Sequence, residues 1–287
     1  MIDSSIQRLQ EYVPLDNASL RIVICALLSY PFAWVFKRIS DKNLTLKNLY
    51  VIVVSSFYVF GILNLRGGIV TLLFSAMGSY LITRYLRTLT MPWINFVFLM
   101  SHLAFNHLQS QFWVEPDPTK IDVTGALMVM VMKLSAFGWN IHDGRLLADS
   151  VSEYSRSRVV KKHPNILPYL GYCFFFASLL TGPAFDFVDY DKFLHYTLFD
   201  DVPEAKRPGK TRKRRIPKSG FQAGFKLLQG VFFATALVIS GFYFNLNYIY
   251  GTEWLKHSFL YRIFYLWFLS VSYRCKYYAI WLIAEGA

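Results

Sequence analysis

Repeated long apolar runs are the feature of this sequence that most restricts its possible folds. A helix needs roughly 20 mostly apolar residues to cross a bilayer, and several runs approach that length. The predicted spanning runs cover 20–36, 49–65, 67–83, 91–107, 121–140, 166–185, 221–244 and 259–273, and a further run begins at Tyr277. Charged residues are 17% of the chain, against about 25% in soluble domains. The sequence therefore predicts an all-α fold, a polytopic transmembrane helical bundle.

Nothing in the composition indicates a second domain or a nucleic-acid partner. No internal repeat or low-complexity tract interrupts residues 1–287, so we expect a single domain. The net charge is +12, but the basic residues gather between apolar runs, as they do in cytoplasmic loops of membrane proteins. Cys25, Cys173 and Cys275 lie far apart with no CxxC spacing, which predicts neither a metal cluster nor a disulfide framework.

The distribution of lysine and arginine between the runs predicts which loops face the cytoplasm. Basic residues gather in 37–47 and 145–162, while the intervening "SQFWVEPDPTK" is acid-leaning and is assigned to the lumenal or external side. The next loop, "AKRPGKTRKRRIPK" at 205–218, is strongly basic and is also predicted to be cytoplasmic. Two consecutive cytoplasmic loops mean that the run 166–185 does not cross the bilayer.

The run 166–185 has the composition of a re-entrant segment, which enters the bilayer and leaves it on the same side. Two prolines and two glycines interrupt regular helix in this run. These residues are Pro168, Gly171, Gly182 and Pro183. Irregular backbone at membrane depth is tolerated only where it is buried in protein or lines a wet cavity. The stretch "LLTGPAFDFVDYDKF" at 179–193 should therefore lie at the lip of a cavity, with its carboxylates toward the cytosol.

Polar residues in and just after the run 121–140 leave two alternatives open. Asn140 and Asp143, in "AFGWNIHDGR", either form a polar cluster at a cavity mouth or belong to a helix end that Gly144 terminates. Lys133 is expected near mid-bilayer, where a charge is costly and needs a partner or water. It either lines a polar tunnel or is paired structurally inside the bundle.

The stretch "YRCKYYAIWLIAEGA" at 273–287 contains three further candidates. Tyr277 and Tyr278 form either an aromatic belt at the membrane interface or part of a cavity wall. Glu285 follows within an apolar helix, where a carboxylate is a functional candidate by default, although an interfacial helix end is the alternative.

Three other patterns are assigned ordinary structural roles. His102 and His107 do not share a helix face and have no third ligand nearby in sequence, so no metal site is predicted. His195 and Asp200 match an acid/base spacing of one acyltransferase class, but a solvated loop is the better interpretation. The basic loop 205–218 is interpreted as a determinant of orientation, with binding of anionic lipid headgroups as the alternative.

Taken together, several stretches resemble the membrane-bound O-acyltransferase family, in its lysophospholipid acyltransferase branch. They are "FGWNIHDG", "LLTGPAFDFVDYDKF", the "IPK" after the basic loop, and "RCKYYAIWLIAEGA", in matching order and spacing. The resemblance implies transfer of an acyl chain from acyl-CoA to the free hydroxyl of a lysophospholipid in the endoplasmic reticulum membrane. It implies membrane lipids and these two substrates as partners, and no cofactor beyond acyl-CoA as co-substrate.

The resemblance also implies where the site lies. The family's catalytic histidine sits in a Trp-His-Gly block and its partner asparagine in a Trp-Asn block. Residues 1–287 contain neither, so we expect no catalytic residue here, an incomplete C-terminal side and no activity for these residues alone. The cytoplasmic entrance for acyl-CoA would be shaped by Gly182, Pro183, Phe185, Asp186 and Tyr190. The alternatives are a non-catalytic membrane protein that binds lipid or assembles with a partner, and a transporter.

Overall fold

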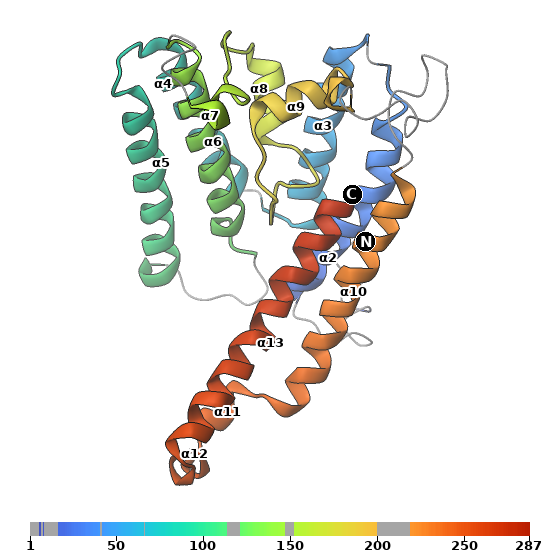
Figure 1. Cartoon of the computed structure of the whole chain (residues 1–287), viewed down its shortest axis with the longest axis vertical. Coiled ribbons are helices and arrows are strands. Elements are labelled where there is room, and N and C mark those ends of the chain that lie inside the picture. Colours follow the sequence, from blue (N-terminus) through green and yellow to red (C-terminus); the bar gives the residue numbers. More distant parts are fainter. Residues whose placement is uncertain are drawn as a thin grey trace. The chain divides into compact units, whose positions relative to one another are not determined.

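The part of the chain described by the computed structural model is built from helices (Figure 1). The described residues are 6, 8, 17–40, 42–65, 67–113, 121–146, 152–199 and 219–287. No β-strand occurs among these residues, and the predicted all-α class is confirmed. Contacts divide the chain into two compact units, residues 1–218 and 219–287, which are described separately below.

The first unit starts with long helices and ends with short ones. The long helices are α2 (Asn17–Phe36), α3 (Leu44–Ser56), α4 (Gly68–Tyr85), α5 (Met91–Leu108) and α6 (Thr124–Asp143). The π-helical turns η1 (Phe57–Ile62) and η2 (Gln109–Trp113) continue α3 and α5. The short elements are α7 (Glu153–Arg156), α8 (Ile166–Cys173), α9 (Phe187–Leu194) and the 3-10 turn η4 (Thr197–Phe199). In Figure 1, α9 runs across one end of the long helices.

Four helices within the described residues are long and apolar enough to cross a membrane. They cover Asn17–Phe36, Leu44–Ile62, Thr124–Asp143 and Gly220–Ile249. More than one such helix makes the protein polytopic, as the sequence predicts. The basic loop 205–218, its "IPK" and most of the "SQFWVEPDPTK" loop lie outside the described residues.

The predicted re-entrant run is broken in the structure, and residues 166–186 are called the broken segment from here on. Its helix α8 has eight residues, so it is about 12 Å long and cannot span a hydrocarbon core of about 30 Å. The chain then runs without α-helix from Phe174 to Asp186, and α9 begins at Phe187. Both flanks of the broken segment lie together, because the Arg158 guanidinium is 3.2 Å from the Asp186 carboxylate. The segment enters and leaves at the same end of the first unit, which is the arrangement that the predicted re-entrant path requires.

Aromatic side chains of the broken segment form the centre of the first unit. Tyr169 and Tyr172 on α8 are fully buried. The Tyr172 ring lies 6.3 Å from Phe137 on α6 and 5.5 Å from Phe187 on α9, measured between ring centroids. Gly171 leaves room for the hydrogen bond from the Tyr190 hydroxyl to Asn48 Oδ1 (2.8 Å), since an added Cβ would collide with both groups. The broken segment is therefore packed inside protein.

The second unit is a helical hairpin. It contains α10 (Gly220–Tyr243), α11 (Leu246–Ile249), α12 (Thr252–Lys256) and α13 (Phe259–Gly286). Gly230 lets α10 approach α13 closely, since a Cβ there would lie 2.6 Å from Ile283. The sequence predicts two apolar runs separated near Arg274, but α13 continues unbroken through that residue. The helix tolerates this because the side chains of Arg274 and Lys276 are exposed on its surface.

Candidate functional site

Asn140, at the end of α6, holds both ends of the broken segment. Its main-chain carbonyl accepts a hydrogen bond from the Val160 amide (3.0 Å), just before the segment. Its side-chain Nδ2 donates to Asp186 Oδ1 (3.1 Å), at the segment's exit. The Gly144 amide also donates to the Asn140 carbonyl at 3.2 Å. Asn140 thus joins the entry and the exit of the broken segment through its main chain and its side chain. This junction of Asn140, Arg158 and Asp186 is called the mouth of the broken segment from here on.

Asp186 is the charged centre of this mouth. Its side chain is only 11% exposed and forms an ion pair with Arg158, which is 39% exposed. The Arg158 guanidinium also lies over the Tyr154 ring, 4.0 Å from its centroid, and donates to the Tyr154 hydroxyl. A carboxylate this deeply buried needs a cation and hydrogen-bond donors, and Arg158 and Asn140 supply them.

Lys133 anchors the interior of the broken segment to α6. The residue is 2% exposed, and its ammonium donates to the main-chain carbonyl of Tyr172 at 2.6 Å. The same ammonium lies 4.4 Å from the Phe185 ring centroid. In return, the Tyr172 hydroxyl shares its one proton between the main-chain carbonyls of Lys133 (3.1 Å) and Phe185 (2.9 Å). Of the two alternatives for Lys133, this geometry favours the structural pairing.

Lys47 has the same kind of role at the other end of this region, and the sequence alone gave no sign of it. The side chain is fully buried, and its ammonium donates to the main-chain carbonyl of Leu194, the last residue of α9. It also lies 3.6 Å from the centroid of the Tyr196 ring. Helix C-termini carry unpaired carbonyls and the negative end of the dipole, so a buried ammonium is stabilised there.

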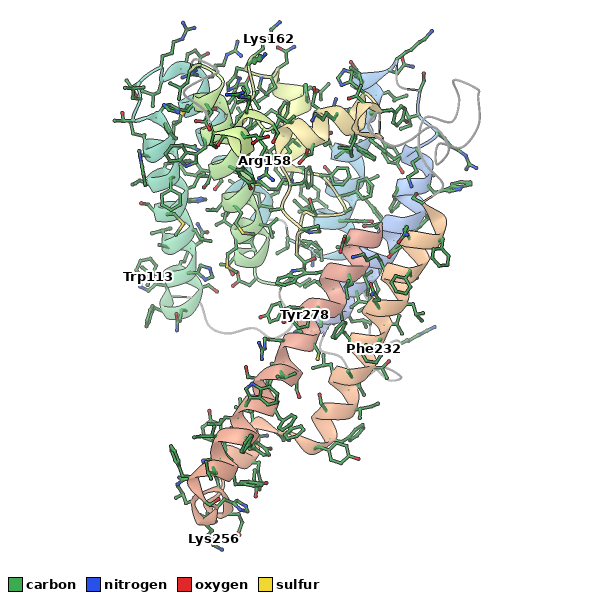
Figure 2. All side chains as sticks on the ribbon, viewed as in Figure 1. Trp113, Arg158, Lys162, Phe232, Lys256 and Tyr278 are labelled. Atoms are coloured by element: carbon green, nitrogen blue, oxygen red, sulfur yellow. The ribbon has the colours of Figure 1, made fainter. Side chains whose placement is uncertain are left out.

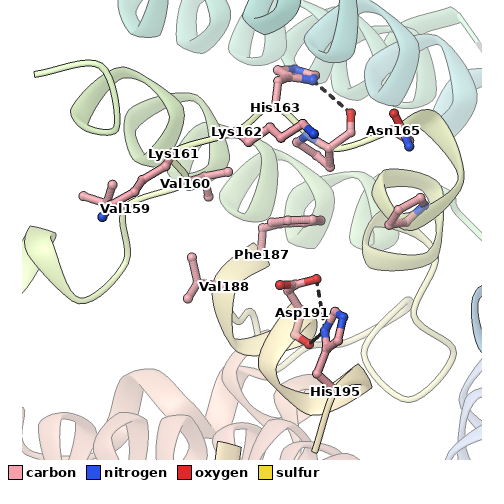
Figure 3. Close-up of a pocket in the computed structure, with 12 residues that line it drawn as sticks. Val159, Val160, Lys161, Lys162, His163, Asn165, Phe187, Val188, Asp191 and His195 are labelled. Carbon is pink, nitrogen blue, oxygen red and sulfur yellow. Dashed lines mark hydrogen bonds and ion pairs between the residues drawn. The ribbon is translucent and has the colours of Figure 1, made fainter. Parts of the chain in front are cut away.

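The structure also has an open cleft of about 700 Å³ beside the mouth (Figure 3). Its walls come from the residues just before the broken segment and from α9 just after it. The lining residues are Val159, Val160, Lys161, Lys162, His163, Pro164, Asn165, Pro168, Phe187, Val188, Asp191 and His195. The sequence marks the two lysines only as determinants of orientation.

His163 connects the cleft wall to α4. Its Nε2 lies 3.1 Å from Thr83 Oγ1, and its ring packs edge-to-face against the Tyr80 ring. Burial lowers the pKa of His163, and the positive charges of Arg84 and Arg145 lower it further, while the Pro164 carbonyl that accepts from the ring opposes them. The neutral imidazole is therefore the form that the fold favours.

The five residues predicted to shape an entrance are placed differently from one another. Gly182 has φ +84°, a conformation that favours glycine, and it directs the chain back toward α9. Pro183 is exposed, whereas Phe185 packs against Tyr172 with 5.6 Å between ring centroids. Tyr190 is buried and bonded to α3, as described above. Only Asp186 lies at the mouth, and none of the five lines the cleft.

Residues of the "AFGWNIHDGR" stretch divide between the two alternatives. Asp143 is the last residue of α6, and its carboxylate lies 3.3 Å from His142 Nδ1. Gly144 is the C-cap and is required there because a Cβ would collide with the main chain of Val160. The helix-end interpretation therefore holds for Asp143 and Gly144, while Asn140 does belong to a polar cluster.

The candidates in the second unit lie on the surface of the hairpin. Tyr277 is 57% and Tyr278 is 39% exposed, and Tyr278 packs against Phe233 of α10 with 5.4 Å between ring centroids (Figure 2 labels Tyr278). Glu285 forms an ion pair with Lys226 at 2.8 Å. This pair joins α10 to α13, which gives Glu285 a structural partner.

Two other predicted patterns have limited structural counterparts. His195 makes its contacts with Asp191, through Nδ1 to the main-chain carbonyl at 2.8 Å. Its predicted partner Asp200 lies outside the described residues. Within the described residues, no group of three or more His, Cys, Asp or Glu side chains lies close enough to hold a metal ion.

Comparison with known proteins adds a family match and several relatives. The model of the membrane-bound O-acyltransferase family (MBOAT) matches residues 108–287. A lysophospholipid acyltransferase of Saccharomyces cerevisiae is 39% identical over 100% of this chain and 48% of that protein. A lysophospholipid acyltransferase of Schizosaccharomyces pombe is 31% identical over 100% of this chain and 55% of its own length. Lysophospholipid acyltransferase 2 of Arabidopsis thaliana is 25% identical over 94% of this chain and 56% of that protein. The chain thus spans about half the length of these relatives.

Proposed function

Because this chain belongs to the membrane-bound O-acyltransferase family, we propose that it forms part of a lysophospholipid acyltransferase. The proposed reaction transfers an acyl chain from acyl-CoA to the free hydroxyl of a lysophospholipid. The observation that carries the proposal is the match of the entire chain to a protein named lysophospholipid acyltransferase, at 39% identity. We further propose the endoplasmic reticulum membrane as its location.

The chemistry of the reaction defines what the protein has to supply. A general base removes the proton of the lysophospholipid hydroxyl, and the oxygen attacks the thioester carbonyl. The resulting oxyanion needs a hydrogen-bond donor until the carbon–sulfur bond breaks and CoA leaves as the thiol. The resemblance assigns these roles to a histidine and an asparagine in blocks that residues 1–287 do not contain.

The residues of this chain would instead build the cytoplasmic approach to the reaction. The broken segment brings non-helical backbone into the helical unit, and such backbone is tolerated only inside protein or beside a cavity. Asn140, Arg158 and Asp186 fix its mouth, and Lys133 fixes its interior. The transporter alternative rests on Lys133 and on the broken segment, and the pairing of Lys133 with a main-chain carbonyl weakens the first of these two observations.

Acyl transfer in isolated membranes tests this proposal. The assay would follow transfer from oleoyl-CoA to lysophosphatidylcholine by residues 1–287 alone and by the same residues followed by a segment with the Trp-His-Gly block. We expect transfer only in the second case, and its loss when the histidine of that block is replaced by alanine. Transfer by residues 1–287 alone would overturn the proposed division of roles. Absence of transfer from the extended chain, with several lysophospholipids tried, would overturn the proposed function.

A further inference from the structure

The cleft beside the broken segment has the dimensions of a ligand site and a lining that combines apolar and basic residues. Its volume of about 700 Å³ falls in the usual range of small-molecule sites. Val160 and Phe187 are buried in its wall, and Val188 is half-buried beside them. Lys161 and Lys162 follow Val160 directly along the chain and are exposed, and their side chains extend in different directions (Figure 3). A ligand in this cleft would meet an apolar surface with exposed ammonium groups at its rim.

The charge balance of the cleft is positive. Neither lysine has an ion-pair partner among the residues that the structure describes. The carboxylate of Asp191, also in the lining, lies 3.5 Å from Nδ1 of His195. His163 points away from the opening toward α4, where its ring is hydrogen-bonded to Thr83. The ammonium groups of Lys161 and Lys162 are therefore the groups that remain to bind an anion.

We propose that this cleft binds a phosphate group carried on a partly apolar molecule. Lysine ammonium groups are suited to phosphate as compact charges with freely turning donors. The adjoining valines and Phe187 favour a ligand that also has a ring or a short apolar part, in preference to free inorganic phosphate. Both substrates of the proposed reaction carry such a group, so the choice of probes rests on the proposed function. The source of the phosphate, nucleotide or lysolipid headgroup, is what the probes distinguish.

Binding to the purified chain in detergent micelles tests the inference without any turnover. Affinities would be measured by isothermal titration calorimetry for adenosine bisphosphate, for short-chain lysophosphatidic acid and for inorganic phosphate. The first variant is Lys161→Gln with Lys162→Gln, and its matched control is Lys42→Gln with Lys192→Gln. The control removes the same charge from exposed lysines that do not line the cleft. A second variant, Val188→Trp, fills the apolar side and leaves every charge in place.

We expect one of the two organic phosphates to bind, and inorganic phosphate to bind more weakly. Loss of two charge-assisted contacts should weaken binding roughly tenfold or more, while the control should change it less than about twofold. Val188→Trp should also weaken binding, with the thermal unfolding midpoint showing that the fold persists. Equal losses in the cleft variant and the control, or no binding of either organic phosphate, would overturn the inference. Neither result depends on acyl transfer, so the two proposals fail separately.

Discussion

The broken segment and helix α10 are two apolar stretches of similar length with opposite surroundings. In the broken segment, Tyr169, Tyr172 and Phe176 are at most 3% exposed, so its apolar side chains form protein core. In α10, the only buried residue is Gly230, and just 6% of its most apolar window is buried. Apolar composition therefore shows that both belong to a membrane protein, but not which one is packed inside protein and which one is exposed.

Backbone hydrogen bonding explains the difference. An unbroken helix such as α10 satisfies its own backbone groups and can stand in lipid. Helix α8 of the broken segment and helix α9 just after it are short, and their terminal carbonyls lack partners within the helix. Lys133 supplies a donor to Tyr172 near the end of α8, and Lys47 supplies one to Leu194 at the end of α9. Arg145 serves the end of α4 similarly, donating to Thr83 (2.8 Å) and Leu86 (2.9 Å). Cationic side chains thus satisfy main-chain carbonyls at the ends of α8, α9 and α4.

The largest expected difference is in whether each stretch crosses the membrane. Labelling of single cysteines from one side of the membrane tests it. Single cysteines would replace Lys162 and Lys192, which flank the broken segment, or Gly220 and Tyr243, at the ends of α10, after replacement of the native cysteines. In sealed vesicles, a membrane-impermeant maleimide should reach the first two positions from the same side. It should reach Gly220→Cys and Tyr243→Cys from opposite sides, because α10 has 24 residues and is about 36 Å long. Labelling of the first pair from opposite sides would show that the broken segment crosses the membrane.

The second-largest difference between the broken segment and α10 should be the loss in the free energy of unfolding when a large aromatic side chain is truncated. Tyr172→Ala removes a fully buried ring and a hydroxyl whose proton is shared between two main-chain carbonyls, and should lower the free energy of unfolding by about 3–5 kcal/mol. Phe232→Ala in α10 removes a ring that is 66% exposed, and should change it by less than about 0.5 kcal/mol. Thermal unfolding in a fixed detergent would measure both. Equal losses would mean that the hairpin is packed as tightly as the broken segment.

Breaking the Asp186–Arg158 pair and breaking the Glu285–Lys226 pair should differ less in their effect on stability. Asp186→Asn removes the charge facing Arg158 but keeps an acceptor for Asn140 Nδ2. Because Arg158 is partly exposed, we expect a loss of only about 1–2 kcal/mol in the free energy of unfolding. Glu285→Gln breaks a pair whose carboxylate side chain is 51% exposed, and should cost less than about 1 kcal/mol. High salt should weaken the Glu285 pair more than the Asp186 pair, and the reverse order would contradict the assigned burial.

Much of this arrangement could be predicted from residue types and their order. The basic loops and the Pro and Gly residues of 166–185 together predicted a segment that does not cross, and in the structure this run is broken and its two flanks meet. Lys133 was identifiable because a lysine in a long apolar run must have a partner. Its partner could not be predicted, because a main-chain carbonyl leaves no mark in the sequence.

Other features depend on contacts between distant residues, which sequence patterns do not reveal. In the sequence, Lys47 belongs to a basic stretch like any other, and only the fold brings it to Leu194, 147 residues away along the chain. Tyr172 is one aromatic among many in an apolar run, although it bonds to two main-chain carbonyls. The cleft likewise needs two flanks of one segment to meet. Conversely, Glu285 stood out as a lone carboxylate, yet its contact with Lys226 is an ordinary helix pairing.

The smallest expected effect concerns the acid sensitivity of the entry to the broken segment. Burial and nearby arginines lower the pKa of His163, so the folded protein resists protonation more than the unfolded chain does. Above the usual histidine pKa of about 6.5 both states are neutral and this residue contributes no pH dependence. As the pH falls below that value, the unfolded state takes up the proton first and the folded state loses stability. The loss ends once the pH is below the folded-state pKa of His163.

His163→Gln should therefore reduce the drop in stability between pH 7 and pH 5, while glutamine can still bond to Thr83. Thermal unfolding midpoints measured at several pH values in one detergent would show the change in slope. His257→Gln is the matched control, since it removes a histidine from the hairpin. If both variants flattened the profile equally, histidine content would explain the acid sensitivity. If only His163→Gln does so, the acid-sensitive contact belongs to the packed mouth of the broken segment, as the comparison with the exposed hairpin requires.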